Sequence, residues 1–231
     1  MAPPLSIIVP TLNEGAQLAG QLAALDNLRA RGAELLVVDG GSSDNTAALA
    51  AQCGARVLLA PRGRAMQMNA GAAASQGAVL LFLHADTRLP PQADQLIAAA
   101  LQGSAVWGRF DVCIDSSRPI LRVVEQMMNW RSRLTGISTG DQAVFVRRSA
   151  FQAAGGFPEI ALMEDIALSR ALLRQSRPVC LRETVRTSGR RWEKNGVWRT
   201  IWLMWRLRAA YFFGADPARL AVLYGYQPPP R

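Results

Sequence analysis

Short apolar runs alternate with segments of helical periodicity through residues 5–101, and this alternation constrains the fold more than any other feature of the sequence. The runs are apolar on both faces, as are strands of a parallel sheet that helices cover on both sides. Such a doubly wound α/β fold binds its ligands beyond the carboxyl ends of the strands. We predict strands at Leu5–Pro10, Glu34–Asp39, Ala55–Leu59 and Ala78–His84, helices at Glu14–Arg29, Arg64–Gln76 and Pro91–Leu101, and a further helix capped by Ser43 or Asp44.

The alternation is less regular beyond residue 104. We predict strands at Val106–Ile114 and Gln142–Arg147, and helices at Ile120–Leu134, Glu164–Arg174 and Val197–Phe213. A chain of 231 residues, of which 50% are apolar, is long enough to bury the core of one domain. We therefore expect a single domain over residues 1–231, made of residues 1–104, residues 105–195 and a helical tail at residues 196–231, whose final PPPR we expect to fray.

The net charge of +9 is concentrated in the second half of the chain. Residues 1–108 carry six Arg against seven Asp and Glu, whereas residues 109–231 carry twenty Lys and Arg against ten Asp and Glu. The two halves are therefore expected to meet different partners.

The cysteines and the chain start favour a cytoplasmic protein. Cys53, Cys113 and Cys180 are odd in number and widely spaced, which favours free thiols over a disulfide or zinc framework. The first residues lack the basic and long apolar regions of a signal peptide. No apolar run reaches the ~18 residues that would span a bilayer.

Polar residues gather where three of the predicted strands end. The first strand leads into Thr11 and Glu14, the second ends at Asp39 ahead of a glycine turn, and the fourth is followed by Asp86. Because the carboxyl ends of parallel strands lie along one edge, Asp39 and Asp86 are expected to face one crevice. Either aspartate alone would also suit a turn or a helix cap.

Three segments, in order and spacing, resemble the donor half of family 2 glycosyltransferases: SIIVPTLNE, LLVVDGGSSDNT and RGRAMQMNAGAAASQGAVLLFLHADT. The resemblance continues through GDQAVFVRRSAFQAAGGFPE and MEDIALSRALLR, so it covers most of the chain. It implies the nucleotide-diphospho-sugar transferase (GT-A) fold and an inverting transfer from a nucleotide diphosphate sugar to an acceptor hydroxyl. Residues 1–104 would bind the donor, and residues 105–195 would carry the acceptor and the catalytic groups.

The resemblance also implies a donor site along the strand ends. UDP is the expected nucleotide, with GDP as the alternative. Thr11 stands where the family usually has an aromatic residue, which changes how the base would stack. The positions that match donor-binding residues are Pro10, Thr11, Asn13, Glu14, Asp39, Gly41, Arg64, Asn69, Ala85 and Asp86.

A divalent cation is expected beside the diphosphate, because negative charge builds on the departing β-phosphate. Mg²⁺ or Mn²⁺ needs only one or two protein carboxylates besides phosphate oxygens and water. The family's paired-Asp motif corresponds to His84-Ala85-Asp86, so the resemblance assigns Asp86 as a metal ligand. His84 is either a second ligand, which would favour Mn²⁺, or a structural hydrogen-bonding residue.

Glu164 and Asp165 begin a predicted helix. Acidic residues in a first turn often only complement the helix dipole. A hydroxyl that attacks an anomeric carbon must also lose its proton, for which a nearby carboxylate is a suitable general base. The resemblance assigns Asp165 as this base, with Glu164 in support, in a one-step displacement without a covalent intermediate.

Two further segments belong to the predicted acceptor or diphosphate side. Gly140-Asp141-Gln142 resembles an acceptor segment of the family, although it would also suit a turn, or Asp141 would orient a hydroxyl of the donor sugar. Arg190-Arg191-Trp192 partly resembles the QxxRW motif of processive members, but Ser188 stands where Gln is expected, so polymer synthesis is not expected. The two arginines either grip the diphosphate or form a solvated basic loop.

The segment at residues 182–213 is both basic and aromatic. Between Arg182 and Arg208, eight cations stand against two acids, and Trp198, Trp202 and Trp205 share one helical face. Such a helix either lies in a membrane interface or packs its Trp face against the core. Peripheral contact with the inner face of a membrane is the first alternative.

Several functions stay open at this point. The transferase would act on a hydroxyl of a small molecule, like the small bacterial transferases of arsenosugar biosynthesis that it most resembles, or on a lipid phosphate such as polyprenyl phosphate. A non-catalytic nucleotide-sugar-binding protein is a second class, against which the retained Asp39, Asp86 and Asp165 argue. Nucleic-acid binding is not expected, because the positive charge avoids the half that holds the motifs.

Overall fold

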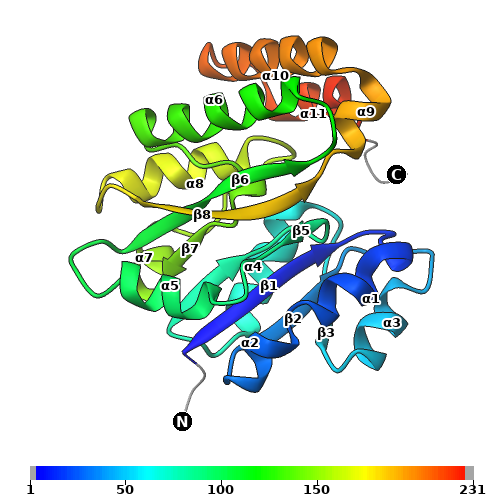
Figure 1. Cartoon of the computed structure of the whole chain (residues 1–231), viewed down its shortest axis with the longest axis vertical. Helices are drawn as coiled ribbons and strands as arrows, with labels where there is room; N and C mark the ends of the chain where they lie inside the picture. The colour runs from blue at the N-terminus through cyan, green and yellow to red at the C-terminus, as the bar shows by residue number, and fades with distance from the viewer. Residues whose placement is uncertain (1–3, 227–231) are drawn as a thin grey trace.

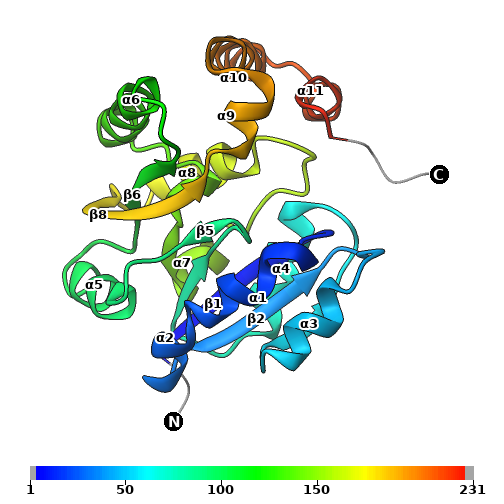
Figure 2. The same cartoon turned by 45° about the vertical axis from the view of Figure 1, so that its right-hand side comes forward.

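The computed structural model describes residues 4–226, which form a mixed sheet between layers of helices (Figures 1 and 2). The strands are β1 (Leu5–Thr11), β2 (Glu34–Asp39), β3 (Arg56–Leu59), β4 (Val79–Phe82), β5 (Thr87–Arg88), β6 (Trp107–Asp115), β7 (Phe145–Arg147) and β8 (Val179–Ser188). Their order in the sheet is β3-β2-β1-β4-β7-β6-β8-β5. The pairs β1–β2, β1–β4, β2–β3 and β6–β8 are parallel, and β4–β7, β6–β7 and β5–β8 are antiparallel.

Helices cover both faces of the sheet. The covering helices are α1 (Gly15–Ala23), α2 (Asp26–Ala30), α3 (Thr46–Gln52), α4 (Arg64–Ala74), α5 (Ala93–Ala100), α7 (Arg148–Ala153) and α8 (Glu164–Leu173). Successive strand residues point to opposite faces, so Ile7 joins a core with α1, α2 and α5 while Ile8 joins one with α4, α7 and α8. The predicted α/β fold with helices on both faces is confirmed.

The register of the parallel strands brings their carboxyl ends to one edge. Thr11 lies opposite Asp39, and Ile8 lies opposite Phe82, so β4 ends beside β1 and leads directly into His84 and Asp86. Gln67 of α4 fixes this edge from below, because its side-chain amide donates to the carbonyl oxygens of Thr11 (2.8 Å) and Val38 (2.7 Å). These two hydrogen bonds tie α4 to the sheet edge on which the sequence motifs converge.

Several predicted boundaries were wrong. The helix expected at Glu14–Arg29 is two helices, α1 and α2, and the break keeps Leu25 and Leu28 in one core cluster. Asn45 rather than Ser43 or Asp44 occupies the N-cap position of α3, but its side chain makes no capping bond; Asp44, one residue earlier, accepts from the backbone N–H of Thr46. The strand predicted from Gln142 begins at Phe145, after the 3-10 helix η1 (Gly140–Gln142). The fraying expected of the PPPR end lies outside the described residues.

The remaining helices form an outer layer beyond the β6–β8 end of the sheet (Figures 1 and 2). They are α6 (Ile120–Thr135), α9 (Arg190–Asn195), α10 (Val197–Phe212) and α11 (Pro217–Tyr224), which confirms the C-terminal helical extension. Trp198, Trp202 and Trp205 of α10 are 73%, 62% and 62% exposed, so the alternative that this Trp face packs against the core was wrong. Among residues 4–226 no helix is long and apolar enough to cross a membrane.

Candidate active site

Two cavities meet at the end of β4. The smaller, of about 370 Å³, lies over the carboxyl ends of β1 and β4 beside the start of α4. The larger, of about 550 Å³, lies between η1, α8, α6 and α10. The residues that line both are Arg64, His84, Asp86, Leu162, Arg191 and Tyr224. This shared wall joins the half of the chain with the donor motifs to the half with the acidic helix start.

Six of the ten residues that match donor-binding positions line the smaller cavity. They are Pro10, Thr11, Glu14, Arg64, Ala85 and Asp86. Burial raises the pKa of Glu14, with the charges of Asp86 and Asp44 adding to the rise and that of Arg190 opposing it. The sequence motifs at the ends of β1 and β4 therefore do converge on one cavity.

The other four residues line neither cavity. The buried carboxylate of Asp39 accepts from the backbone N–H groups of Gly41 (3.0 Å) and Ser42 (2.8 Å), which is the turn role that an aspartate before glycine commonly takes. The amide of Asn69 pairs with the backbone of Phe157, and Asn13 accepts from the backbone N–H of Ser43 (2.8 Å). Nucleotide contact by Asn13, Asp39, Gly41 and Asn69 stays a prediction.

His84 and Asp86 stand at the shared wall. Burial, with a smaller effect from the charge of Arg64, lowers the pKa of His84 to about 3, so its imidazole is neutral at physiological pH. A neutral imidazole and a carboxylate form a donor set suited to Mn²⁺. Residues 4–226 contain no group of three or more His, Cys, Asp and Glu side chains that would hold a metal ion alone. A cation here would also need oxygens from its ligand, as Mg²⁺ and Mn²⁺ sites on phosphates do.

Glu164 forms an ion pair with Arg64, in which Oε1 lies 3.1 Å from Nε. This pairing is the main reason that the pKa of Arg64 is raised, whereas burial raises the pKa of Glu164 against the effect of Arg64. Arg64 lines both cavities, but Glu164 lines neither. The structure therefore places Glu164 behind the wall, as a residue that positions Arg64.

Asp165 faces the larger cavity from the first turn of α8. Its Oδ2 accepts from the backbone N–H of Gly140 (3.0 Å) and its Oδ1 from that of Ile166 (2.8 Å). The preceding Met163 has a φ of 71°, a left-handed conformation that is rare for a bulky residue and is often found at functional sites. Both carboxylate oxygens are thus held in place at the cavity wall.

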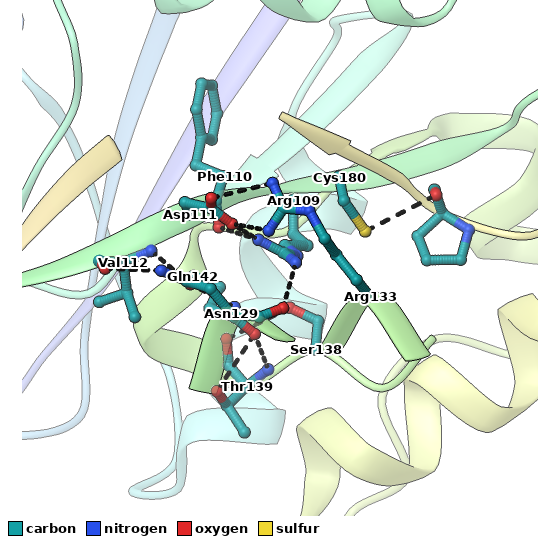
Figure 3. A network of polar contacts seen from close by, with 11 residues as sticks. Arg109, Phe110, Asp111, Val112, Asn129, Arg133, Ser138, Thr139, Gln142 and Cys180 are labelled. Atoms are coloured by element: carbon teal, nitrogen blue, oxygen red, sulfur yellow. Dashed lines mark hydrogen bonds and ion pairs between the residues drawn. The ribbon is translucent and has the colours of Figure 1, made fainter. Parts of the chain in front are cut away.

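Asp141 and Gln142 of η1 point to different surroundings. Asp141 lines the larger cavity, and its buried Oδ1 has no hydrogen-bond partner among the described residues. Gln142 is fully buried and lines neither cavity; it bonds with Thr139 and Asn129 (Figure 3). Asn129 in turn pairs with both backbone groups of Val112. Gln142 thus connects η1 to β6 through Asn129, and its predicted place on the acceptor side stays a prediction.

The arginines at the start of α9 lie beside the acidic residues of the donor edge. Nη2 of Arg190 is 3.9 Å from Oε2 of Glu14 and 3.9 Å from Oδ2 of Asp86. Arg191 lies over the ring of Tyr224 at 3.7 Å and lines both cavities, while Trp192 lines the larger one. Arg191 is thus part of the cavity wall, whereas Arg190 is 53% exposed and lines neither cavity; a grip of both arginines on the diphosphate stays a prediction.

Sequence reasoning missed several residues that line the cavities. Arg62 and Tyr226 line the smaller cavity, with the guanidinium 5.3 Å from the ring centre, and Arg131 and Arg208 line the larger one. The YGY segment that contains Tyr226 lies more than a hundred residues from the donor motifs at residues 6–87, and no local pattern connects the two. Arg131 and Arg208 lie in predicted helices, at positions where an arginine fits a solvated helix face as well as it fits a cavity wall.

Comparison with known proteins gives the family. The model described as Glycosyl transferase family 2 matches residues 6–153. An uncharacterized glycosyltransferase of Mycobacterium tuberculosis (strain ATCC 25618 / H37Rv) is 30% identical over 138 residues, which cover 56% of this chain and 59% of that protein. The chain therefore matches less than two thirds of the length of this curated relative.

Solved structures share the fold at low identity. S. aureus TarS 1–349 in complex with UDP-GlcNAc has a TM-score of 0.66 at 19% identity, covering 81% of this chain and 58% of that one. Mannosyltransferase PcManGT from Pyrobaculum calidifontis, in complex with GDP-Man and Mn²⁺, has a TM-score of 0.65 at 19% identity, covering 98% and 70%. These likenesses confirm the GT-A fold, and because the family model covers more than half of the sequence, the chain belongs to glycosyl transferase family 2.

Proposed function

We propose that this protein transfers a sugar from a nucleotide diphosphate to an acceptor hydroxyl, with inversion at the anomeric carbon. The observation that carries the proposal is that two cavities share the wall of Arg64, His84 and Asp86, while Asp165 faces only the larger cavity. A donor in the smaller cavity would present its anomeric carbon at this wall, and the acceptor would approach from the other side. Residues 1–104 then supply most of the donor side, together with Arg191 and Tyr226, and residues 105–195 supply Asp165 on the acceptor side.

The smaller cavity suits a nucleoside diphosphate. Arg62, Arg64 and Arg191 supply guanidinium groups for phosphate oxygens, and Tyr226 supplies an aromatic face near the site. We propose UDP as the nucleotide, with GDP as the alternative. The structural likeness to TarS with UDP-GlcNAc and to PcManGT with GDP-Man supports both.

Mg²⁺ or Mn²⁺ is the proposed cofactor, with Asp86 as a ligand. If His84 is the second ligand, its neutral imidazole favours Mn²⁺. The cation would neutralise charge on the departing diphosphate. The complex of PcManGT with GDP-Man and Mn²⁺ supports this assignment.

Asp165 is the proposed general base. The acceptor oxygen bonds to the anomeric carbon while the bond from that carbon to the diphosphate oxygen breaks. The hydroxyl proton passes to the Asp165 carboxylate, and the nucleoside diphosphate leaves with the bonding electron pair. Attack from the side opposite the leaving group inverts the anomeric centre, and Glu164 contributes by holding Arg64.

The proposed setting is the cytoplasmic face of a membrane. Trp198 and Trp202 are exposed next to the exposed Arg199 and Arg206, a combination suited to an interface with anionic lipid. Contact through residues 182–213 would be peripheral. A hydroxyl-bearing small molecule, as in arsenosugar biosynthesis, and a lipid phosphate, as in polyprenyl-phosphate transfer, are the two proposed acceptor classes.

Titration with UDP, with and without Mn²⁺, tests the donor part of the proposal. We expect UDP to bind at least about tenfold more weakly without Mn²⁺ or in Asp86→Ala, because one bound carboxylate–cation contact is worth more than about 1.4 kcal/mol. Asp26→Ala, at an exposed position of α2, is the matched control and should bind as the unmodified protein does. UDP binding without turnover of any nucleotide sugar would instead favour the non-catalytic nucleotide-sugar-binding protein.

A further inference from the structure

The outer part of the larger cavity is apolar. Its walls there come from α6 and α10, which run side by side at the top of Figures 1 and 2. The side chains that form these walls are Val124, Met127 and Met128 of α6 and Ile201, Met204 and Trp205 of α10. A nucleotide, a phosphate or a free sugar would find few hydrogen-bond partners between these helices.

The apolar walls continue to the protein surface. Three of the lining side chains are largely exposed to solvent: Met127 is 52%, Trp205 is 62% and Trp130 is 67% exposed. These side chains therefore form an open rim rather than a sealed core. Large apolar side chains held open to solvent mark binding sites more often than structural cores.

Two guanidinium groups stand on the inner part of the same cavity. Nε and Nη2 of Arg131 are buried without hydrogen-bond partners among residues 4–226, although its Nη1 lies 3.4 Å from the carbonyl oxygen of Ile137. Burial, and then the neighbouring charge of Arg208, lowers the pKa of Arg131 to about 10 against the smaller opposing effects of Asp141 and Asp165, so the group is still charged at neutral pH. A buried cation with unpaired N–H groups is costly, and an anion would relieve that cost.

We propose that the acceptor is an anionic amphiphile, whose apolar part lies between α6 and α10 and whose anionic group pairs with Arg131 and Arg208. This inference rests on the proposed function, because it takes the larger cavity as the acceptor site. The reactive oxygen of the acceptor would then reach Asp165, which lines the same cavity. A hydrophilic anion would use the guanidinium groups but not the apolar walls, and an uncharged apolar molecule would use the walls but not the unpartnered N–H groups of Arg131.

The fluorescence of the cavity tryptophans, Trp130, Trp192 and Trp205, gives a direct binding assay. The probes are decyl phosphate below its micellar concentration, inorganic phosphate and decanol. We expect decyl phosphate to bind about tenfold or more tightly than either of the others, because only it fills both the apolar and the cationic part. Inorganic phosphate tests whether a free anion is sufficient, and decanol tests whether an apolar chain is sufficient.

Variants locate the binding. Met204→Glu and Met127→Glu place a carboxylate on each apolar wall, and Arg208→Gln removes one cation; each should weaken decyl phosphate binding about tenfold. Leu59→Glu changes a more exposed apolar residue of β3, at the opposite edge of the sheet, and should have no effect. Thermal melting and Mn²⁺-dependent UDP binding verify that each variant is folded.

Equal affinity for decyl phosphate and inorganic phosphate, or for decyl phosphate and decanol, overturns the proposal. Unchanged decyl phosphate binding in Met127→Glu and Met204→Glu overturns it too, since the chain would then lie elsewhere. The UDP measurement distinguishes a wrong acceptor class from a wrong proposed function. If UDP binds with Mn²⁺ but decyl phosphate does not bind, only the acceptor class is wrong, whereas absent UDP binding contradicts the proposed function itself.

Discussion

The backbone N–H of Gly140 donates to Oδ2 of Asp165 at 3.0 Å, and a Cβ at Gly140 would lie only 2.4 Å from Nε2 of His84. A single residue without a side chain thus separates the imidazole at the shared wall from the proposed base. This spacing sets how near the donor and acceptor sides of the site lie to each other. It also explains why glycine stands here although its φ is not left-handed.

Replacement of this glycine should disturb both groups. In Gly140→Ala the added methyl group displaces His84 or η1, and overpacking of this kind costs about 1–3 kcal/mol of folding free energy. We expect sugar transfer to fall about tenfold or more, because Asp165 loses its placement. Gly20→Ala is the control: an added Cβ there meets nothing within 4 Å, so activity and melting temperature should not fall. Equal effects of the two variants would contradict this relationship.

The pair of Glu164 with Arg64 should matter for donor binding more than for the chemical step. Glu164→Gln keeps the shape but removes the charge opposite Arg64, so the guanidinium is less firmly held at the shared wall. We expect the KM for the nucleotide sugar to rise several-fold while kcat changes less. Glu34→Gln is the control. It alters the ion pair of Glu34 with Arg56 at the start of β2, away from the strand ends that form the site, and should leave KM and kcat unchanged. A fall in kcat alone would assign chemistry to Glu164.

The ionised carboxylate of Asp141 should lower the free energy of unfolding at neutral pH. Burial raises the pKa of Asp141 above its usual 3.8, so the folded protein binds this proton more tightly than the unfolded chain does. Its contribution is then most favourable below about pH 3.8 and is lost as the pH rises through the folded-state pKa. We expect Asp141→Asn to raise the melting temperature at pH 7 by roughly 2 °C or more, and this gain to shrink toward pH 4.

Asp94 provides the control of opposite sign. The hydrogen bond from Arg31 lowers the pKa of Asp94, so its contribution is present above the unfolded pKa and is lost as the pH falls. Asp94→Asn should therefore lower the melting temperature slightly at pH 7, since the pair is at the surface. A loss of stability at pH 7 in both variants would contradict the assignment for Asp141.

The exposed Trp face of α10 should mediate membrane contact. Trp198→Glu and Trp202→Glu remove the side chains that would enter the interface and add charges that anionic lipid repels. We expect both variants to co-sediment less with vesicles that contain phosphatidylglycerol, and the binding of the unmodified chain to weaken with salt. Leu59→Glu serves again as the control. Vesicle binding that is unaffected by both Trp variants would contradict the proposed contact.

The parallel half of the fold could be predicted because its signal is local. The strands β1, β2 and β4 are buried on both faces, so they are continuous apolar runs, and their ends carry the motifs that lead to Thr11 and Asp86. In contrast, eight of the ten residues of β8 are exposed or half-buried, and five of the ten are Arg, Thr or Glu, so no apolar alternation marks it as a strand. Its place between β6 and β5 depends on pairing across long stretches of chain.

The site could be predicted only in part for a similar reason. The sequence leaves Asp39 open to a turn role or a donor-binding role, and the structure shows the turn role, in which its carboxylate accepts from the N–H groups of Gly41 and Ser42. Likewise, Gln142 follows Asp141 directly, yet one side chain bonds with Asn129 of α6 and the other lines a cavity. The direction of a side chain within a turn is set by tertiary contacts that residue type and spacing do not encode.

The most direct test of the account is one variant measured in two assays. Asp165→Asn should bind UDP with Mn²⁺ within about twofold of the unmodified protein, because Asp165 faces only the larger cavity. Its rate of sugar transfer from UDP-glucose or UDP-GlcNAc, to water or to an acceptor identified by screening, should fall by about 10²–10⁴-fold, as expected for loss of a general base. Near-normal turnover by Asp165→Asn would show that another group accepts the proton and would contradict the account.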